Sequence, residues 1–131
     1  AQRALDEATA NLDAVAAVPV ADVTFDNVIA PLMAPPNFKT NPLICQSKFL
    51  QHCSTDAALR EAAEEAGKKF AAFKADARRR SDVYAKVTAY AASAEAKALP
   101  YYQAHFVQAI VSDFERGGLA LSSSDQTKRR R

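Results

Sequence analysis

The sequence predicts an all-α fold: one domain over residues 1–131, built as an antiparallel bundle of about six helices. Three observations lead to this prediction. Alanine is abundant in the 131 residues, whereas only three are glycine, and alanine has the highest intrinsic helix propensity. Apolar residues recur at intervals of three or four over most of the chain, as they do on one face of a helix. No segment shows the strict alternation of a half-buried strand. A chain of this length can also bury a core of its own.

The N-terminal third is expected to hold two helices. The first spans Gln2–Ala17 and stops before Pro19, which cannot continue a helical hydrogen-bond ladder. Its apolar residues share one face: Leu5, Leu12 and Val15. The four residues after Pro19 are expected to form a short extended link. Thr24 then caps a second helix ending near Met33, because a threonine side chain can accept an orphan backbone N–H. Pro31 lies inside that helix and should kink or loosen it.

The middle of the chain predicts two further helices. The third runs from about residue 40 to residue 53, and its apolar residues are Leu43, Ile44, Phe49 and Leu50. Ser54, Thr55 and Asp56 are expected to supply a loop and an N-cap, and a long fourth helix then extends to about Arg79. Gly67 lies inside this helix, where it costs about 1 kcal/mol relative to alanine. The expected apolar stripe of the fourth helix is Leu59, Ala62, Ala63, Ala66, Phe70, Phe73 and Ala77.

The C-terminal part predicts a helical hairpin around which the other helices should pack. Ser81 is expected to be the N-cap of its first helix, and Pro100 is expected to end that helix and open the next. The apolar residues of the first helix are Val83, Val87, Tyr90 and Ala94. Those of the second are Tyr102, Phe106, Ile110 and Phe114, widened by Val107 and Val111. Gly117–Gly118 predicts a left-handed C-cap, with Leu119 covering the last turn.

The two cysteines lie eight residues apart on the third expected helix. A rise of about 1.5 Å per residue separates Cys45 from Cys53 by roughly 12 Å, which is too far for a disulfide between them. We expect both to be buried thiols in a reducing compartment. With His52 they could suggest a metal site, but zinc needs three or four ligands and only His105 remains, far along the chain. We therefore expect no metal ligand here, and packed thiols instead.

The charged residues predict solvated faces rather than a binding site. Acidic and basic side chains of the fourth helix should pair along its exposed face: Arg60, Glu61, Glu64, Glu65, Lys68 and Lys69. Arg78–Arg80 ends that helix, where the dipole favours positive charge; an anion or nucleic-acid contact is the alternative. Lys128–Arg131 suggests the start of a surface helix, with a nuclear-import or nucleic-acid patch as the alternative. The net charge of +2 is too small to indicate nucleic-acid binding by itself.

Several function classes lack their sequence signals. No apolar run of about 18 residues indicates a membrane span, and no N-terminal pattern indicates a secretory signal. The sequence contains no H-E-x-x-H zinc motif, no glycine-rich phosphate loop and no G-x-S-x-G elbow. Of Tyr101 and Tyr102, one ring is expected to be in the core and the other exposed. Because the chain starts at Ala1 and ends in a basic run, we expect it to be part of a longer protein.

Four segments together resemble a known family. Residues 81–87 read SDVYAKV and residues 106–121 read FVQAIVSDFERGGLAL. Upstream, residues 23–32 read VTFDNVIAPL and residues 54–73 read STDAALREAAEEAGKKFAAF. Taken in their order along the chain, 23–32, 54–73, 81–87 and 106–121, the segments resemble the N-terminal region of the thimet oligopeptidase, neurolysin and oligopeptidase A family of zinc metallopeptidases. The resemblance covers roughly the whole chain.

The resemblance implies a mostly helical fold in which this region forms one wall of a deep channel. The family's zinc-binding motif is absent from this sequence, so the resemblance transfers no catalytic, metal-binding or substrate-binding residue. It implies zinc in the parent enzyme, short peptide substrates and the rest of the parent chain as partners. It also implies an intracellular location, in the cytoplasm, a mitochondrion or a plastid. Cys45, His52 and Cys53 match no motif of the family.

Two other functions stay open from the sequence. The chain could be a free-standing helical bundle that binds other proteins, or a basic bundle that binds nucleic acid. Our first expectation is the peptidase region, inactive by itself, with no nucleic-acid or membrane partner. We also expect the isolated chain to self-associate or to be only marginally stable as a monomer, because a channel wall exposes surface that the parent protein would cover.

Overall fold

The computed structural model describes residues 2–33 and 42–119. In the second range, the exposure of side chains is described from residue 45 onward. The described residues form seven α-helices, one 3-10 helix and one π-helix, and none of them lies in a strand, which confirms the all-α prediction. The α-helices are α1 (Gln2–Ala17), α2 (Ala30–Met33), α3 (Pro42–Cys53), α4 (Ala57–Ala77), α5 (Ser81–Ala91), α6 (Ala94–Lys97) and α7 (Tyr101–Arg116).

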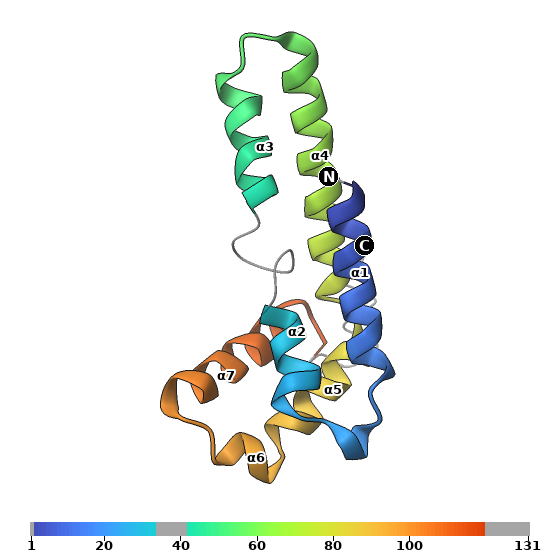
Figure 1. Ribbon diagram of the computed structural model, residues 1–131, viewed down its shortest axis with the longest axis vertical. Coiled ribbons are helices and arrows are strands. Elements are labelled where there is room, and N and C mark those ends of the chain that lie inside the picture. Colours follow the sequence, from blue (N-terminus) through green and yellow to red (C-terminus); the bar gives the residue numbers. More distant parts are fainter. Residues whose placement is uncertain (1, 34–41, 120–131) are drawn as a thin grey trace.

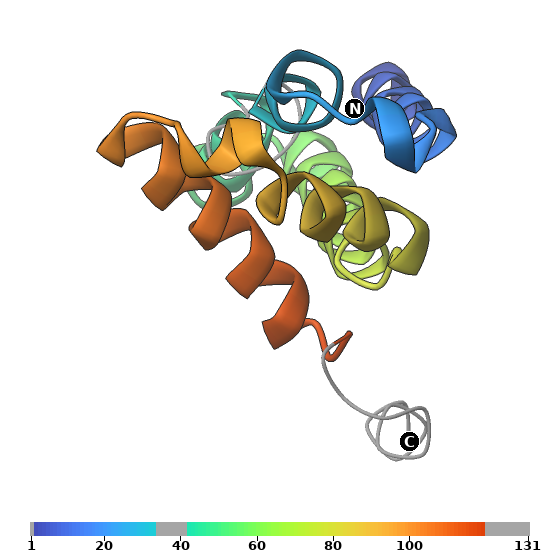
Figure 2. The same cartoon turned by 90° about the horizontal axis from the view of Figure 1, so that it is seen from below.

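The helices form a base and a projecting arm (Figure 1). The base contains α2, α5, α6 and α7, and α6 joins α5 to α7 at the lower edge of the base in Figure 1; Figure 2 shows the molecule from below. The arm consists of α3 and the N-terminal half of α4, which pack against each other. Helix α1 runs beside the C-terminal half of α4 and contacts α5 and α2. No helix within the described ranges is both long and apolar enough to cross a membrane.

The hydrophobic core lies in the base. Its fully buried side chains come from α1, α2, the π-helix, the end of α4, α5 and α7. They are Leu12, Val15, Val28, Ile29, Leu32, Ala77, Val83, Val87, Tyr90, Val107 and Phe114. No described residue of α3 belongs to this cluster. The arm therefore depends on its own two-helix packing rather than on the central core.

Helix α1 agrees with the sequence prediction in bounds and in face. Leu5, Leu12 and Val15 are buried, together with Ala4 and Ala8. The link after Pro19 was predicted to be extended, and that prediction is wrong. Val20–Asp22 forms a 3-10 turn, because the N–H of Asp22 donates to the carbonyl of Pro19 at 3.0 Å. The turn satisfies a backbone donor that an extended link would leave to solvent.

Thr24 caps the next helix as predicted. Its hydroxyl accepts from the N–H of Asn27, and the Asn27 side chain accepts in return from the N–H of Thr24, which completes a capping box. The loosening of the helix that was predicted around Pro31 takes the form of a π-helical segment. Phe25–Ile29 is a π-helix that passes into α2 just before Pro31. A proline supplies no N–H to the ladder, and a wider turn ahead of it accommodates that loss.

Helix α4 begins at the predicted cap but buries a narrower stripe than expected. The Asp56 carboxylate accepts from the N–H groups of Ala58 and Leu59 at 2.9 and 3.4 Å. The buried residues of α4 are Ala63, Phe70 and Ala77, which recur every seven positions. Leu59 and Ala62 are exposed, contrary to the prediction. Leu59 lies in the first turn at the tip of the arm, and Ala62 lies a quarter turn off the buried row.

The C-terminal hairpin has an additional break. Helix α5 ends at Ala91, and Ser93 caps the short α6 by accepting from the N–H of Ala96 at 3.2 Å. Pro100 is therefore the N-cap of α7 and not the end of α5. Ser81 is also not the N-cap: it is the first residue of α5, preceded by Arg80. The residues that pack into the core are as predicted for α5, except that Ala94 is exposed in α6.

Helix α7 buries a face rotated from the predicted one. Val107 and Phe114 are buried and seven residues apart, while Phe106 and Ile110 are only partly buried. Tyr102 was predicted to begin the stripe but is 70% exposed. The residues of α7 that belong to the core or pack against it begin at Phe106, so the first turn of α7 adds no side chain to the core.

Gly117–Gly118 ends α7 for two separate reasons. Gly118 has a φ of 101°, its N–H donates to the carbonyl of Glu115, and the N–H of Leu119 donates to the carbonyl of Phe114. These bonds make a Schellman cap, as predicted. Gly117 has an ordinary helical φ, but a Cβ there would lie 2.6 Å from the carbonyl oxygen of Arg78. Position 117 therefore requires glycine because the end of α7 lies close to the backbone at the end of α4.

Substitution of the two α7 phenylalanines should separate a core position from a peripheral one. Phe114→Ala should lower the free energy of unfolding by about 3–5 kcal/mol, because a fully buried ring leaves a cavity. Phe106→Ala should cost less, since that side chain is only partly buried. Urea melts of both variants check this order. An equal loss in the two variants would contradict the burial pattern of α7.

The same change at two glycines should have opposite effects. Gly67→Ala should raise the free energy of unfolding by about 0.5–1 kcal/mol, because its Cβ would meet no atom within 4 Å and alanine favours the helix. Gly117→Ala should lower it by about 1–3 kcal/mol, since the new Cβ would clash with two backbone oxygens. Thermal and urea unfolding measure both. Equal effects would show that the α4–α7 contact is looser than described.

Candidate functional site

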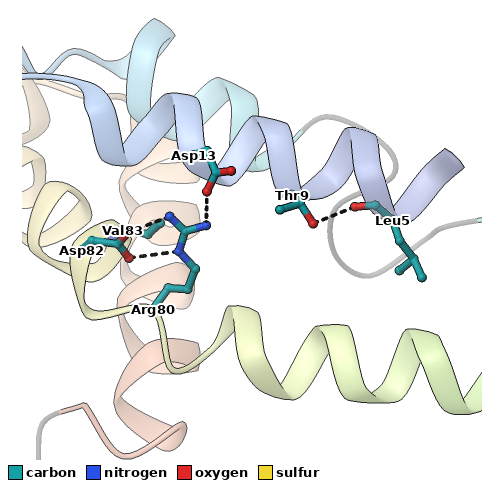
Figure 3. Close-up of polar contacts among 6 residues, drawn as sticks. All are labelled: Leu5, Thr9, Asp13, Arg80, Asp82 and Val83. Carbon is teal, nitrogen blue, oxygen red and sulfur yellow. Dashed lines mark hydrogen bonds and ion pairs between the residues drawn. The ribbon is translucent and has the colours of Figure 1, made fainter. Parts of the chain in front are cut away.

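Arg80 is the most connected polar side chain between helices in the described structure (Figure 3). It lies just before α5, and its guanidinium reaches two carboxylates. Its Nε and Nη2 donate to the two oxygens of Asp82 at 3.0 and 2.6 Å, and its Nη1 donates to Asp13 on α1. The side chain is 24% exposed, so the pair with Asp82 is partly screened from water. Arg80 thereby fixes the start of α5 against α1.

The charges in this cluster shift one another's titration. The hydrogen bond from Arg80 lowers the pKa of Asp82, and the N–H of Val83 at 2.9 Å adds to this lowering. The same hydrogen bond raises the pKa of Arg80 above its ordinary value. Both groups therefore stay charged throughout the neutral range. The cluster contains no group that would gain or lose a proton near neutral pH by these shifts, so its geometry suits a structural joint rather than acid–base chemistry.

The neighbouring arginines also have acidic partners. Arg78 lies 3.9 Å from Asp113 on α7, and Arg79 lies 3.7 Å from Asp76 on α4. These ion pairs give Arg78 and Arg79 structural contacts beyond the helix dipole, and the anion or nucleic-acid alternative stays untested. Lys128–Arg131 lies outside the described residues.

The charged face of α4 forms as predicted at one i, i+4 pair. Lys68 and Glu64 lie 2.8 Å apart, and their mutual hydrogen bond lowers the pKa of Glu64 and raises that of Lys68. Both side chains are largely in solvent, so this pair contributes solubility rather than a site.

The thiols are not where the sequence predicted them. Cys45 and Cys53 are free and exposed on α3, and the prediction of buried, packed thiols is wrong. The apolar spacing led to a wrong prediction because α4 is the helix against which α3 mainly packs among the described residues, so spacing alone did not show which face of α3 it covers. His52 is exposed on the same helix, whereas His105 stacks on Tyr101 of α7 with ring centroids 6.1 Å apart. Within the described ranges, no three histidine, cysteine or acidic side chains come together as a metal site.

Two tyrosines begin α7 at the surface. Tyr101 is 86% exposed and Tyr102 is 70% exposed, so the prediction that one of these rings is in the core is wrong. Together with His105 they form an aromatic surface beside the α6–α7 turn. Such rings offer stacking area and hydroxyl groups to a partner. Sequence spacing alone could not separate them from core residues, because Tyr102 continues the i, i+4 series of Phe106.

One buried hydroxyl has no protein partner among the described residues. Tyr90 is fully buried, its ring packs edge-on against Phe25 at 6.3 Å, and its hydroxyl accepts and donates no hydrogen bond there. Burial raises the pKa of Tyr90, and the negative charges of Glu95 and Asp26 raise it further. The phenol stays protonated at neutral pH. Because the ring is enclosed in the core, its role is packing.

No protein-family model and no curated protein matches this chain. The described geometry therefore has to be interpreted by itself. The described residues provide a polar joint at Arg80, an exposed aromatic surface at the start of α7 and an exposed face on α3.

The Arg80–Asp82 pair should make stability fall at acid pH. Asp82 has a folded-state pKa below its unfolded value of about 4, so its contribution is present above pH 4 and is lost as the pH falls through the folded-state value. Asp82→Asn should cost less than about 1 kcal/mol at pH 7, because the carboxylate is half-exposed, and the difference should vanish near pH 2. Urea melts across this range measure it. Asp76→Asn, at a more exposed pair, is the control and should change little.

Proposed function

We propose that this chain is the N-terminal helical region of a zinc-dependent oligopeptidase that hydrolyses short peptides. In this proposal the chain forms part of a channel wall and supplies no catalytic group. The observation that carries it is the order of the four family-like segments, which ends in the residues DFERGGL at positions 113–119.

The positions of these segments in the fold support the proposal. The first contains Thr24, which caps the π-helix, and the second starts beside Asp56, which caps α4. The last contains Gly117 and Gly118, which end α7 against Arg78. The resemblance thus falls on residues that set where helices begin, end and touch. A protein with the same segments in the same order would form a similar helical arrangement.

The chemistry of the parent enzyme would come from residues outside this sequence. In such an enzyme, zinc polarises the scissile carbonyl and activates a water molecule, and a motif glutamate acts as the base. A helical wall contributes by limiting access to short, unfolded peptides. The exposed aromatic surface of Tyr101 and Tyr102 is a surface that the rest of such a protein, or a peptide in its channel, could contact.

A second candidate function is a free-standing protein-interaction module. The exposure of large apolar side chains supports it: Phe49 on the arm is 65% exposed, and Tyr101 and Tyr102 on the base are at least as open. Apolar side chains that are exposed in clusters mark interaction surfaces. The two functions differ in whether a catalytic region accompanies this chain.

The transcript that encodes this chain should distinguish the two functions. We expect its reading frame to continue past Arg131 into an H-E-x-x-H motif with a glutamate downstream. The full translated protein should cleave a quenched fluorescent peptide and lose that activity to a zinc chelator, whereas residues 1–131 alone should be inactive and bind no stoichiometric zinc. A stop codon soon after Arg131, with a stable monomeric 131-residue protein, would contradict the peptidase proposal and favour the interaction module.

A further inference from the structure

The outer face of α3 carries an exposed row of two thiols and one aromatic ring. Cys45, Phe49 and Cys53 are all exposed, and Phe49 is 65% exposed. The partly buried side chains of the same helix recur at different positions, Ser47, Leu50 and Gln51. Since α4 is the helix that α3 packs against, these mark the inner face. We call Cys45, Phe49 and Cys53 the outer row.

The outer row is symmetric about its centre. Cys45 precedes Phe49 by four residues and Cys53 follows it by four, so each thiol lies about 6 Å along the helix axis from the ring. Residues spaced by four form one ridge of a helix surface. If a second α3 meets this ridge in the opposite direction with the two Phe49 rings at the crossing, Cys45 lies opposite the partner's Cys53. The reverse pair forms by the same symmetry.

We propose that a second copy of this chain docks antiparallel on the outer row and that two disulfides, each from Cys45 to the partner's Cys53, lock the pair. Packing of two such ridges crosses the helices at about −50° with axes about 8–10 Å apart. Each cysteine is four residues from Phe49 and therefore turned about 40° from it, so its Cα, about 2.3 Å from the axis, projects about 1.8 Å toward the partner and the facing cysteine Cα atoms lie about 4.5–6.5 Å apart. A disulfide requires about 4.4–6.8 Å, so the bond fits without distorting either helix.

The charge of the face suits a second copy. A two-fold interface places each residue opposite residues of the same surface, so a charged face would repel itself. The outer row has no formal charge, and the only acidic or basic residue of α3 other than histidine is Lys48, which points a quarter turn away from Phe49. The helix has 12 residues and is about 18 Å long, which is too short to bury a standard interface area. The covalent bonds therefore carry the stability of this pair.

The cross-link is an oxidation and needs an electron acceptor. A small-molecule disulfide such as oxidised glutathione serves. The Cys45 thiolate attacks it, forms a mixed disulfide and releases one reduced glutathione. The partner's Cys53 thiolate then attacks the mixed disulfide and releases the second glutathione. Each protein bond thus consumes one glutathione disulfide, and the two protons leave on the two glutathione thiols. This pairing rests on the α3 surface alone and stands whichever proposed function is correct.

The test is oxidation of the 131-residue chain with glutathione disulfide, followed by non-reducing electrophoresis and mass measurement. The chain should form a covalent dimer whose peptide map contains Cys45 joined to Cys53. Cys45→Ser should form no covalent dimer, and neither should Cys53→Ser, because each remaining thiol faces a serine. A mixture of the two variants, one of them isotope-labelled, should form the cross-linked heterodimer. Circular dichroism of the reduced variants checks that each is folded.

Controls outside the cysteines test the docking itself. Phe49→Ala should slow cross-linking about tenfold, which corresponds to about 1.4 kcal/mol of lost apolar contact. Leu59→Ala, which removes an exposed apolar side chain away from the row, should leave the rate unchanged. Self-linking by either single cysteine variant would overturn the antiparallel pairing, because it requires identical cysteines to meet. Glutathione adducts without dimer, or equal rates for Phe49→Ala and the unaltered chain, would overturn the docking.

Discussion

The close approach of Gly117 to the carbonyl oxygen of Arg78 is the constraint on which the base depends. A side chain at position 117 would prevent the ends of α4 and α7 from meeting, and the approach holds α7 where Val107 and Phe114 reach the core. Two residues after Arg78, Arg80 joins α5 to α1 through Asp82 and Asp13. The short stretch after α4 thus positions three helices by one steric fit and one ionic joint. Its arginines resemble a binding patch in the sequence, yet in the fold they have carboxylate partners.

The chain divides its stability unequally between the base and the arm. The base buries aliphatic and aromatic side chains from at least five elements, whereas the arm is a two-helix pair in which the buried residue of the N-terminal half of α4 is Ala63. A helical pair with so little burial gains less from the hydrophobic effect than the base does. It can therefore open locally without unfolding the core. A region that can open locally is suited to binding a partner, and the exposed outer row of α3 lies in this region.

Much of the fold could be predicted from local patterns because helix boundaries are set locally. Gln2–Ala17, the capping box at Thr24 and the Schellman cap at Gly118 each follow from side chains within a few positions. The break before Ser93 was missed because alanines on both sides keep the helical pattern continuous. The close approach of Gly117 to the end of α4 could not be predicted from the sequence, since it depends on the backbone oxygen of Arg78, which is far away in the chain.

The exposure of individual side chains was the hardest property to predict from the sequence. The candidate binding surfaces depend on this exposure. A periodic apolar residue is buried only if a neighbouring helix covers it, and spacing does not reveal the neighbour. Tyr102 precedes the residues of α7 that pack on the core, and the thiols of α3 are exposed although α3 packs against α4. The exposed residues include the aromatic surface of α7 and the outer row of α3. A wall region of a larger enzyme and a free-standing module both need exposed surfaces of this kind. What separates the two is whether a catalytic region accompanies this chain, whereas the proposed pairing through Cys45, Phe49 and Cys53 is the same in both cases.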